Sequence, residues 1–297
     1  MADIFRESPD SGGGRGKILA LPALTDIKDL PTLPAVAAQA LAVAEDPTAT
    51  ASDLLRVIMT DPPLAAKVLK IANSVHFHRG HDVSDLQTAI VRLGFSNVRN
   101  LLMGVSLMRT FNAFFIGSPY SREDFWVHSI STGVLASRLT PKSEQLCAST
   151  SFVLGLLHDL GKLILDRYAR DSFVDAIRLA QGEGIPLAEA ERRRFGRDHA
   201  QLAGELLSIW RFPRELCEPV RWHHEPARCE AAHRPHAVVL QAADWICSVH
   251  KLGYSGNDHP ERPDGADLKR LGLDDGRIAD LLKTLEGDPL IQSLIPV

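Results

Sequence analysis

Apolar residues recur every three or four positions in one segment after another beyond the first 30 residues. Leu54, Val57 and Ile58 share one helical face, for example, and Leu64 and Val68 share another. No stretch of strand length alternates apolar and polar residues, which argues against a β-rich fold. The sequence therefore predicts an all-α protein. The predicted helices span residues 34–45, 52–59, 62–72, 85–93, 96–111, 122–138, 144–160, 171–181, 187–193, 199–210, 214–222, 236–251 and 278–286.

The chain has 297 residues, 45% of them hydrophobic, so it is long enough to bury a large core. Residues 1–17 are polar and glycine-rich and are predicted to form a flexible tail. Two helical parts are predicted to follow, over residues 18–118 and 119–252, with the first packed on the second. Residues 253–297 are predicted to be a surface loop or flexible connection, rich in Gly, Pro, Asp and His, and then a short helical segment.

Charge and cysteine usage narrow the class of protein. The net charge of −4 gives no electrostatic footprint for nucleic acid, and the basic residues are scattered apart from Arg192, Arg193, Arg194 and Arg197, so no DNA partner is expected. The four cysteines have no CxxC spacing, which favours a reducing cytoplasm over a secreted disulfide framework. No apolar run approaches the roughly 18 residues of a membrane span, so neither export nor insertion is expected.

An adjacent pair of ionisable residues, His158 and Asp159, ends the nearly continuous apolar run of residues 151–157. Burying such groups costs several kcal/mol unless they are paired or bound to a cation. Imidazole and carboxylate together suit a borderline divalent ion such as Mn, Fe, Ni or Zn. A His–Asp hydrogen bond closing the helix is an equally good interpretation of this segment taken alone.

Two further groups lie where helical faces should be apolar. Asp244 interrupts the apolar helix of residues 238–247, and Asp is seldom buried without a partner. His128 follows Asp124 by four residues, so the two side chains share a helix face and could reach one ion. Asp124 also completes a capping box with Ser121, and the cap is the better interpretation, although both roles are possible.

Imidazoles also lie at two helix ends. His199 opens a helix after Asp198, a predicted N-cap, and the pair His223 and His224 closes another helix just before residue 225. A pair of histidines at a helix C-terminus is alternatively a favourable placement in the helix dipole. The predicted helix ends bring these groups to a common rim.

The ordered set of these residues resembles the HD superfamily of metal-dependent phosphohydrolases, with Asp124 where some HD-GYP members have a further acidic ligand. Sequence fragments at residues 33–36, 61–74, 89–94, 125–128, 155–162 and 198–204 together resemble the HDOD domain over about residues 31–226. HDOD domains are similar to HD-GYP cyclic-dinucleotide phosphodiesterases, are generally regarded as regulatory, and many lack metal ligands. This resemblance implies a bacterial signalling module with an HD-like helical core.

The resemblance also implies one or two divalent ions. The first would be held by His128, His158, Asp159 and Asp244. The second would share Asp159 as a bridge and add His199 with His223 or His224. In an enzyme, Asp159 would be catalytic through the metal, and Lys162 would neutralise a phosphate. The Asp-Gly-x-Gly-Tyr-Pro segment of HD-GYP proteins does not follow residues 223–228, so cyclic di-GMP hydrolysis is not expected.

Three functions remain open from the sequence. The preferred one is a non-catalytic signalling module that binds a protein partner or a nucleotide, with a filled or occluded site. The second is a metal-dependent phosphohydrolase acting on a nucleotide or phosphodiester, with an accessible cleft and an open coordination position. The third is a metal-free scaffold in which His158 and Asp159 satisfy each other.

Overall fold

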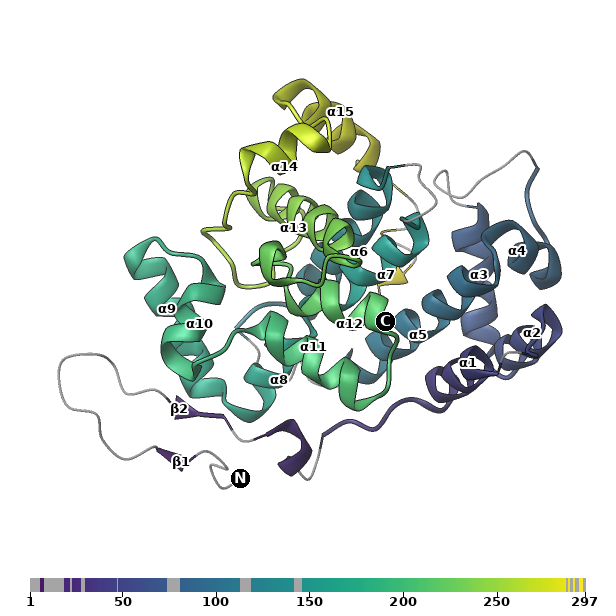
Figure 1. The fold of residues 1–297 in the computed structure, drawn as a ribbon, viewed down its shortest axis with the longest axis horizontal. Coiled ribbons are helices and arrows are strands. Elements are labelled where there is room, and N and C mark those ends of the chain that lie inside the picture. Colours follow the sequence, from purple (N-terminus) through teal and green to yellow (C-terminus); the bar gives the residue numbers. More distant parts are fainter. Residues whose placement is uncertain are drawn as a thin grey trace.

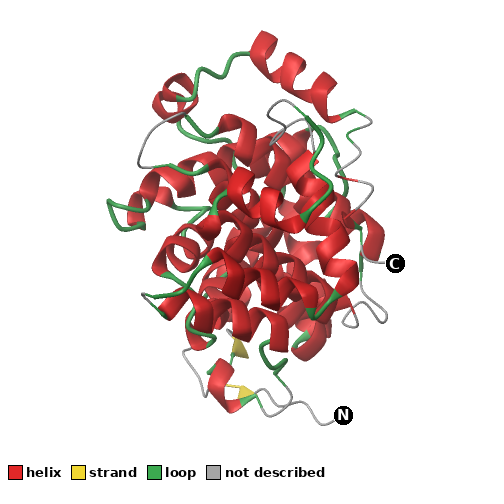
Figure 2. Cartoon of the chain, turned by 90° about the vertical axis from the view of Figure 1, so that its right-hand side faces the viewer, coloured by secondary structure: helices red, strands yellow, loops and turns green. Residues whose placement is uncertain are grey.

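The computed structural model describes residues 6–7, 19–21, 23–27, 30–46, 48–73, 81–112, 119–141, 146–286, 288, 291 and 294–295. The predicted all-α fold is confirmed, since packed helices make up most of the described chain (Figure 2). The described residues also include two short antiparallel strands, β1 (Arg6–Glu7) and β2 (Leu19–Ala20). The predicted flexible tail therefore lies outside the described residues, apart from β1.

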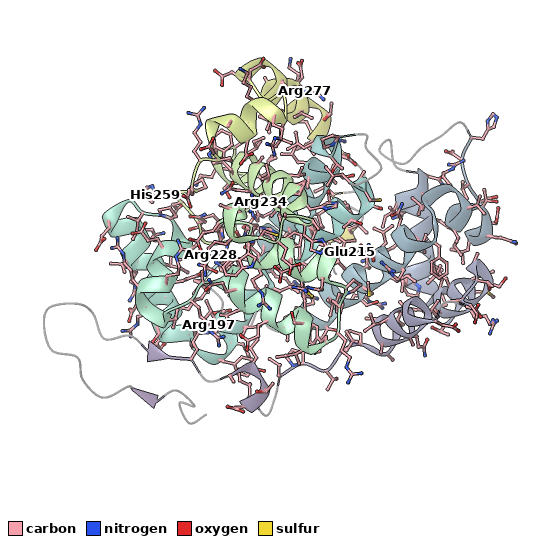
Figure 3. The ribbon with its side chains drawn as sticks, viewed as in Figure 1. Arg197, Glu215, Arg228, Arg234, His259 and Arg277 are labelled. Carbon is pink, nitrogen blue, oxygen red and sulfur yellow. The ribbon has the colours of Figure 1, made fainter. Side chains whose placement is uncertain are left out.

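The N-terminal helices lie together on one side of the molecule (Figure 1). They are α1 (Ala35–Glu45), α2 (Ala51–Met59), α3 (Pro62–Asn73), α4 (Leu86–Leu93) and α5 (Phe95–Phe111), preceded by the 3-10 helix η1 (Leu24–Asp26). α5 packs against α1, α3 and α4 on this side and against α7 (Ala148–Leu157) on the other. An ion pair of 3.0 Å between Arg99 of α5 and Glu215 (labelled in Figure 3) joins α5 to the second helical part as well.

The second helical part surrounds α7, which packs against α5, α6, α12 and α13. Its other elements are α6 (Arg122–Leu139), α8 (Leu160–Tyr168), α9 (Arg170–Glu183), α10 (Leu187–Phe195), α11 (His199–Ile209), α12 (Arg214–Arg221), the 3-10 helix η3 (Pro226–Arg228) and α13 (Arg234–Val249). Two further helices, α14 (Gly265–Arg270) and α15 (Asp275–Leu285), lie at the top of Figure 1. One continuous hydrophobic core runs through both helical parts, and the four-segment division stays a prediction.

The predicted helix over residues 144–160 is wrong at both ends. The helix α7 begins only at Ala148 and ends at Leu157, and a turn at His158 and Asp159 separates it from α8. The apolar periodicity could not reveal this turn, because buried residues continue through Leu160 and beyond. The run 148–168 is long and apolar enough to cross a membrane, but 94% of its apolar 18-residue window is buried inside the protein, as expected of core helices.

Two glycines allow α6 and α7 to cross at very close range. A Cβ atom added to Gly155 of α7 would lie 2.2 Å from the backbone nitrogen of Gly133 in α6. A Cβ atom added to Gly133 would lie 2.6 Å from the carbonyl oxygen of Phe152. The crossing therefore admits no side chain at either position. It brings the end of α7, with His158, next to the face of α6 that carries His128.

Candidate metal centre

Seven predicted ligand residues meet in one buried cluster, at the place where α6, the α7–α8 turn, α11, the end of α12 and α13 converge. Their potential ligand atoms form overlapping groups of three, each within 4.8 Å. These groups are His199, His223 and His224; His128, His158 and Asp159; and His158, His223 and Asp244. Among the predicted metal ligands, only Asp124 lies outside these groups.

The first ligand group joins α6, the α7–α8 turn and α13. Nε2 of His128 lies 3.0 Å from Oδ1 of Asp244. Nε2 of His158 lies 3.4 Å from Oδ2 of Asp159 and 3.6 Å from Oδ1 of Asp244. The structure thus places together the four residues expected to bind a first ion.

The second ligand group joins α11 and the segment after α12. Nε2 of His199 lies 2.9 Å from Nε2 of His224 and 3.2 Å from Oδ1 of Asp159. The ring of His223 lies between the two groups, with its centroid 5.2 Å from that of His158 and 5.7 Å from that of His199. Asp159 faces the first group through Oδ2 and the second through Oδ1, which is the arrangement expected of a bridging carboxylate.

Two of the histidines have their ring orientation fixed by the backbone. Nδ1 of His158 donates to the carbonyl of Gly155, and Nδ1 of His223 donates to the carbonyl of Val220, each at 2.8 Å. Because a carbonyl only accepts, both Nδ1 atoms carry a proton, and Nε2 is the atom through which the neutral ring would present a lone pair to the cluster. Among the described residues, neither Nε2 atom makes a hydrogen bond. A protonated Nδ1 on a backbone acceptor and a free Nε2 are typical of metal-ligating histidine.

The carboxylates of the cluster are held ionised by their neighbours. Burial alone would raise the pKa of Asp159, but the surrounding His158, Lys162 and His199 outweigh it and hold that pKa well below its usual range. Burial likewise opposes ionisation of Asp244, and the imidazoles of His128 and His158 reverse the effect, so its pKa is also well below the usual range.

The histidines of the second group fall into two classes. Burial lowers the pKa of His199, but Glu191 and Asp159 more than compensate and raise it to about 9. Burial, followed by the charges of His158 and His199, lowers the pKa of His223 to about 3. Burial and the same kind of repulsion hold the pKa of His224 well below its usual range. Three imidazoles in contact therefore differ sharply in their hold on a proton.

These shifts predict how the stability of the metal-free protein depends on pH. Below about pH 6.5, the unfolded chain protonates residues His223, His224 and His236, whose folded pKa values are depressed (to about 3 for His223 and about 4 for His236). The free energy of unfolding should therefore fall on acidification, by about 1.4 kcal/mol per pH unit for each histidine. The raised pKa of His199 acts oppositely: its contribution is complete below about pH 6.5 and is lost as pH rises through about 9.

Urea unfolding of chelator-treated protein between pH 4.5 and 9 measures this profile, which should have its maximum near neutrality. The variant His236→Gln, outside the cluster, should flatten the acid limb by one proton. A profile that is flat from pH 7 to 5 would contradict the expected proton uptake.

Asp124 and Lys162 occupy different positions from those of the clustered ligands. Asp124 is exposed at the start of α6, where its backbone nitrogen donates to Oγ of Ser121 at 2.9 Å and its carboxylate accepts from the same hydroxyl. This is the capping role that the sequence favoured. The ammonium of Lys162 is buried, 2.9 Å from Asp159 and 3.0 Å from Oγ of Ser255.

The first part of the loop after α13 does not lie at the surface as its composition predicted, although His259, Glu261 and Arg262 further along are exposed. Ser255, Gly256 and Asn257 are buried, and Asn257 accepts from the backbone nitrogen of Leu187 at 3.3 Å. Gly253 has a φ of +70° and packs so closely that an added Cβ would lie 2.3 Å from the backbone nitrogen of His128. Composition predicted exposure because it cannot register these tertiary contacts. Residues 253–258, hereafter the closing loop, cover the cluster on the Lys162 side.

Glu191 is a site residue that the sequence interpretation missed. It is fully buried in α10, and its carboxylate contacts His199. The available signal was its spacing, because Leu187, Glu191 and Phe195 form a stripe with four-residue intervals in which both neighbours are apolar and buried. An acid in the middle of such a stripe needs a partner.

The arginines that stood out in the sequence are engaged with acids. Arg192 pairs with Asp198 at 2.5 Å, Arg193 with Glu183 at 2.6 Å, and Arg197 (Figure 3) with Glu205. Their positive charge is therefore offset locally. Asp198 also caps α11 in a capping box with Gln201, which confirms the predicted N-cap in front of His199.

The fold and the buried His/Asp cluster define a helical protein related to the HD superfamily. Residues 30–226 match the family model of the HDOD domain, and the chain belongs to that family. It spans 40% and 34% of the lengths of two curated relatives, at 24% and 31% identity.

Solved structures share this fold. An HDOD domain protein of unknown function from Geobacter sulfurreducens has a TM-score of 0.67 at 22% identity, covering 91% of this chain and 89% of its own. A candidate phosphohydrolase from Shewanella amazonensis has a TM-score of 0.67 at 22% identity, covering 92% and 97%. A candidate signal transduction protein from Marinobacter aquaeolei has a TM-score of 0.64 at 26% identity, covering 90% and 59%.

Proposed function

We propose that this protein is a signal-transduction module of the HDOD family that holds an HD-type divalent metal centre in a closed site. The main support for a bound metal is that the Nε2 atoms of His158 and His223 are buried, face the cluster and make no hydrogen bond among the described residues. Leaving a buried polar atom unpaired costs about 1–3 kcal/mol. Cations in contact with these atoms would offset that cost.

The ligand chemistry supports a borderline transition ion. Neutral imidazoles with two carboxylates suit Fe, Mn, Ni or Zn rather than Ca or Mg, which prefer oxygen ligands. His128, His158, Asp159 and Asp244 would hold one ion, and His199 with His223 and His224 a second. Such an ion, when bound, supplies Lewis-acid polarisation and fixes the geometry of its ligands.

Closure of the site supports a regulatory rather than a catalytic role. His158, Asp159, His199 and His223 are at most 1% exposed. The closing loop and the ammonium of Lys162 occupy the side of Asp159 at which a substrate phosphate would be neutralised. A catalytic metal site keeps an open position and an accessible cleft. The likeness to the Marinobacter aquaeolei protein supports the same role.

The test is elemental analysis of the purified protein beside its His158→Ala variant. We expect one or two equivalents of a transition ion in the wild type and a loss of at least one equivalent in the variant. His158 belongs to two of the three clustered sets of potential ligands, one with His128 and Asp159 and one with His223 and Asp244. His259→Ala, at an exposed histidine (Figure 3), is the matched control and should keep the full content. Negligible metal in all three proteins would refute the metal centre.

A phosphohydrolase is the second candidate, favoured by the position of Asp159 between two ligand groups. A metal-loaded sample is assayed with bis(p-nitrophenyl) phosphate and with nucleotides. Turnover that disappears in His158→Ala but not in His259→Ala would favour the enzyme. Metal without turnover supports the regulatory module.

The proposed partner of the module is a signalling protein or a nucleotide. With the cluster closed, a signalling protein or a nucleotide would bind at the surface. No DNA partner is proposed, because the prominent arginines are already paired with acids.

A further inference from the structure

Glu191 and His199 form the tightest contact around the cluster. Oε2 of Glu191 accepts from the backbone nitrogen of His199 at 2.8 Å and from its Nδ1 at 2.6 Å. Both residues are 0% exposed. Among the described residues, Oε1 of Glu191 makes no hydrogen bond, so the hydrogen bonds of this carboxylate are directed to His199. Glu191 therefore sets both the entry of the chain into α11 and the orientation of one ring.

His199 is fixed on its other sides as well. Its carbonyl packs against Gly161 of α8, where an added Cβ would lie only 1.9 Å from the oxygen. Its Nε2 faces Oδ1 of Asp159 at 3.2 Å and Nε2 of His224 at 2.9 Å. The imidazole of His199 in α11 therefore lies between two carboxylates. Its Nδ1 contacts Glu191 of α10, and its Nε2 faces Asp159.

We propose that Glu191 is the positioning residue of the second ligand group. Its carboxylate holds the Nδ1 proton of His199, so that Nε2 is the atom presented to an ion beside His223 and His224. This inference rests on the proposed metal centre and adds a residue, outside the ligand set, on which the second ion depends.

The choice of acceptor distinguishes His199 from the other fixed rings. Backbone carbonyls hold Nδ1 of His158 and His223, whereas an ionisable side chain holds that of His199. A carboxylate behind a ligating histidine orients the ring and makes it a stronger donor, and removing such a partner typically lowers metal affinity about 10- to 100-fold. The second ion should therefore be more sensitive to Glu191 than the first.

Titration of the metal-depleted protein with Co²⁺, followed by visible absorption and equilibrium dialysis, tests the proposal. We expect Glu191→Ala to weaken the site formed by the His199 group about 10- to 100-fold, and to leave the site of the His128 group nearly unchanged. Glu191→Gln, which keeps an acceptor without the charge, should lie between Ala and wild type. Glu189→Ala is the matched control, since Glu189 lies on the same helix in a half-exposed ion pair with Arg193.

A second readout separates positioning from general stability. In the zinc-loaded wild type, ¹⁵N–¹H spectra should show His199 protonated at Nδ1, and that signal should be kept in Glu191→Gln and lost in Glu191→Ala. If Glu191→Ala does not fold, Glu191→Gln alone decides the question through its Co²⁺ affinity.

The outcomes separate the two proposals. Failure of the wild type to bind Co²⁺ overturns the metal centre and the role of Glu191 with it. Binding by the wild type with unchanged affinity and spectra in both Glu191 variants overturns the role of Glu191 only.

Discussion

Gly155→Ala should lower the free energy of unfolding by about 3 kcal/mol or more, the upper range for an overpacked core. The added methyl would lie 2.2 Å from the nitrogen of Gly133 and 2.3 Å from its Cα, and both are backbone atoms that no rotamer change can move. The helices α6 and α7 would have to separate. Urea unfolding followed by circular dichroism measures the loss.

The matched control is Gly182→Ala in α9, where nothing lies within 4 Å of an added Cβ. Alanine is the better helix former by about 0.5–1 kcal/mol, so this variant should be at least as stable as the wild type. Separating α6 from α7 also moves His128 away from His158, and Gly155→Ala should lose metal together with stability. A variant within about 1 kcal/mol of the wild type would contradict the close crossing, because overpacking typically costs more than that.

Asp159→Ala should destabilise the metal-free protein by about 3–5 kcal/mol, the usual effect of breaking a buried ion pair. The variant leaves the ammonium of Lys162 buried, 2% exposed, with the hydroxyl of Ser255 at 3.0 Å as its remaining hydrogen-bond partner among the described residues. Chemical unfolding in the presence of a chelator isolates this effect from any loss of metal.

A double-mutant cycle shows whether the pair is the cause. Lys162→Met removes the stranded charge, so the double variant Asp159→Ala/Lys162→Met should recover a large part of the lost stability. Asp280→Ala is the matched control, because Asp280 and Lys283 have the same three-residue spacing but are more than two-thirds exposed. It should cost no more than about 1 kcal/mol. Additive effects of Asp159 and Lys162 would contradict their coupling.

The sequence predicted the helical fold well because most of its helices bury a periodic apolar face. α2 shows why: a capping box at Thr50 and Asp53 marks its start, and Leu54, Val57 and Ile58 are buried as the period requires. The period failed at the α7–α8 turn, where residues on both sides are buried, no proline marks the break, and the nearest glycines lie inside the helices. The local sequence pattern there indicates that the residues are buried, but it does not indicate that the chain turns.

The candidate ligands were predictable because imidazole and carboxylate at apolar positions are costly, and each such residue pointed to a partner. The burial of Glu191 was not predicted, because an acid in an arginine-rich helix is typical of the surface. It is buried by the tertiary packing of α10 on α9 and α11. The burial of the closing loop was not predicted for a related reason. Its glycines and asparagine are typical of surface turns, and its burial depends on contacts with α8 and α10 that no local window contains.

His128 and Asp244 touch across 116 residues of chain, and this separation has a consequence for biosynthesis. At about 5–20 residues per second, the ribosome would release α13 on the order of ten seconds after α6. During that interval, His128, His158 and Asp159 are available as an incomplete ligand set. Once α13 has emerged, the chain would complete its centre with whichever ion the cell then supplies, so expression in media of different metal content should yield different ions in the same folded protein.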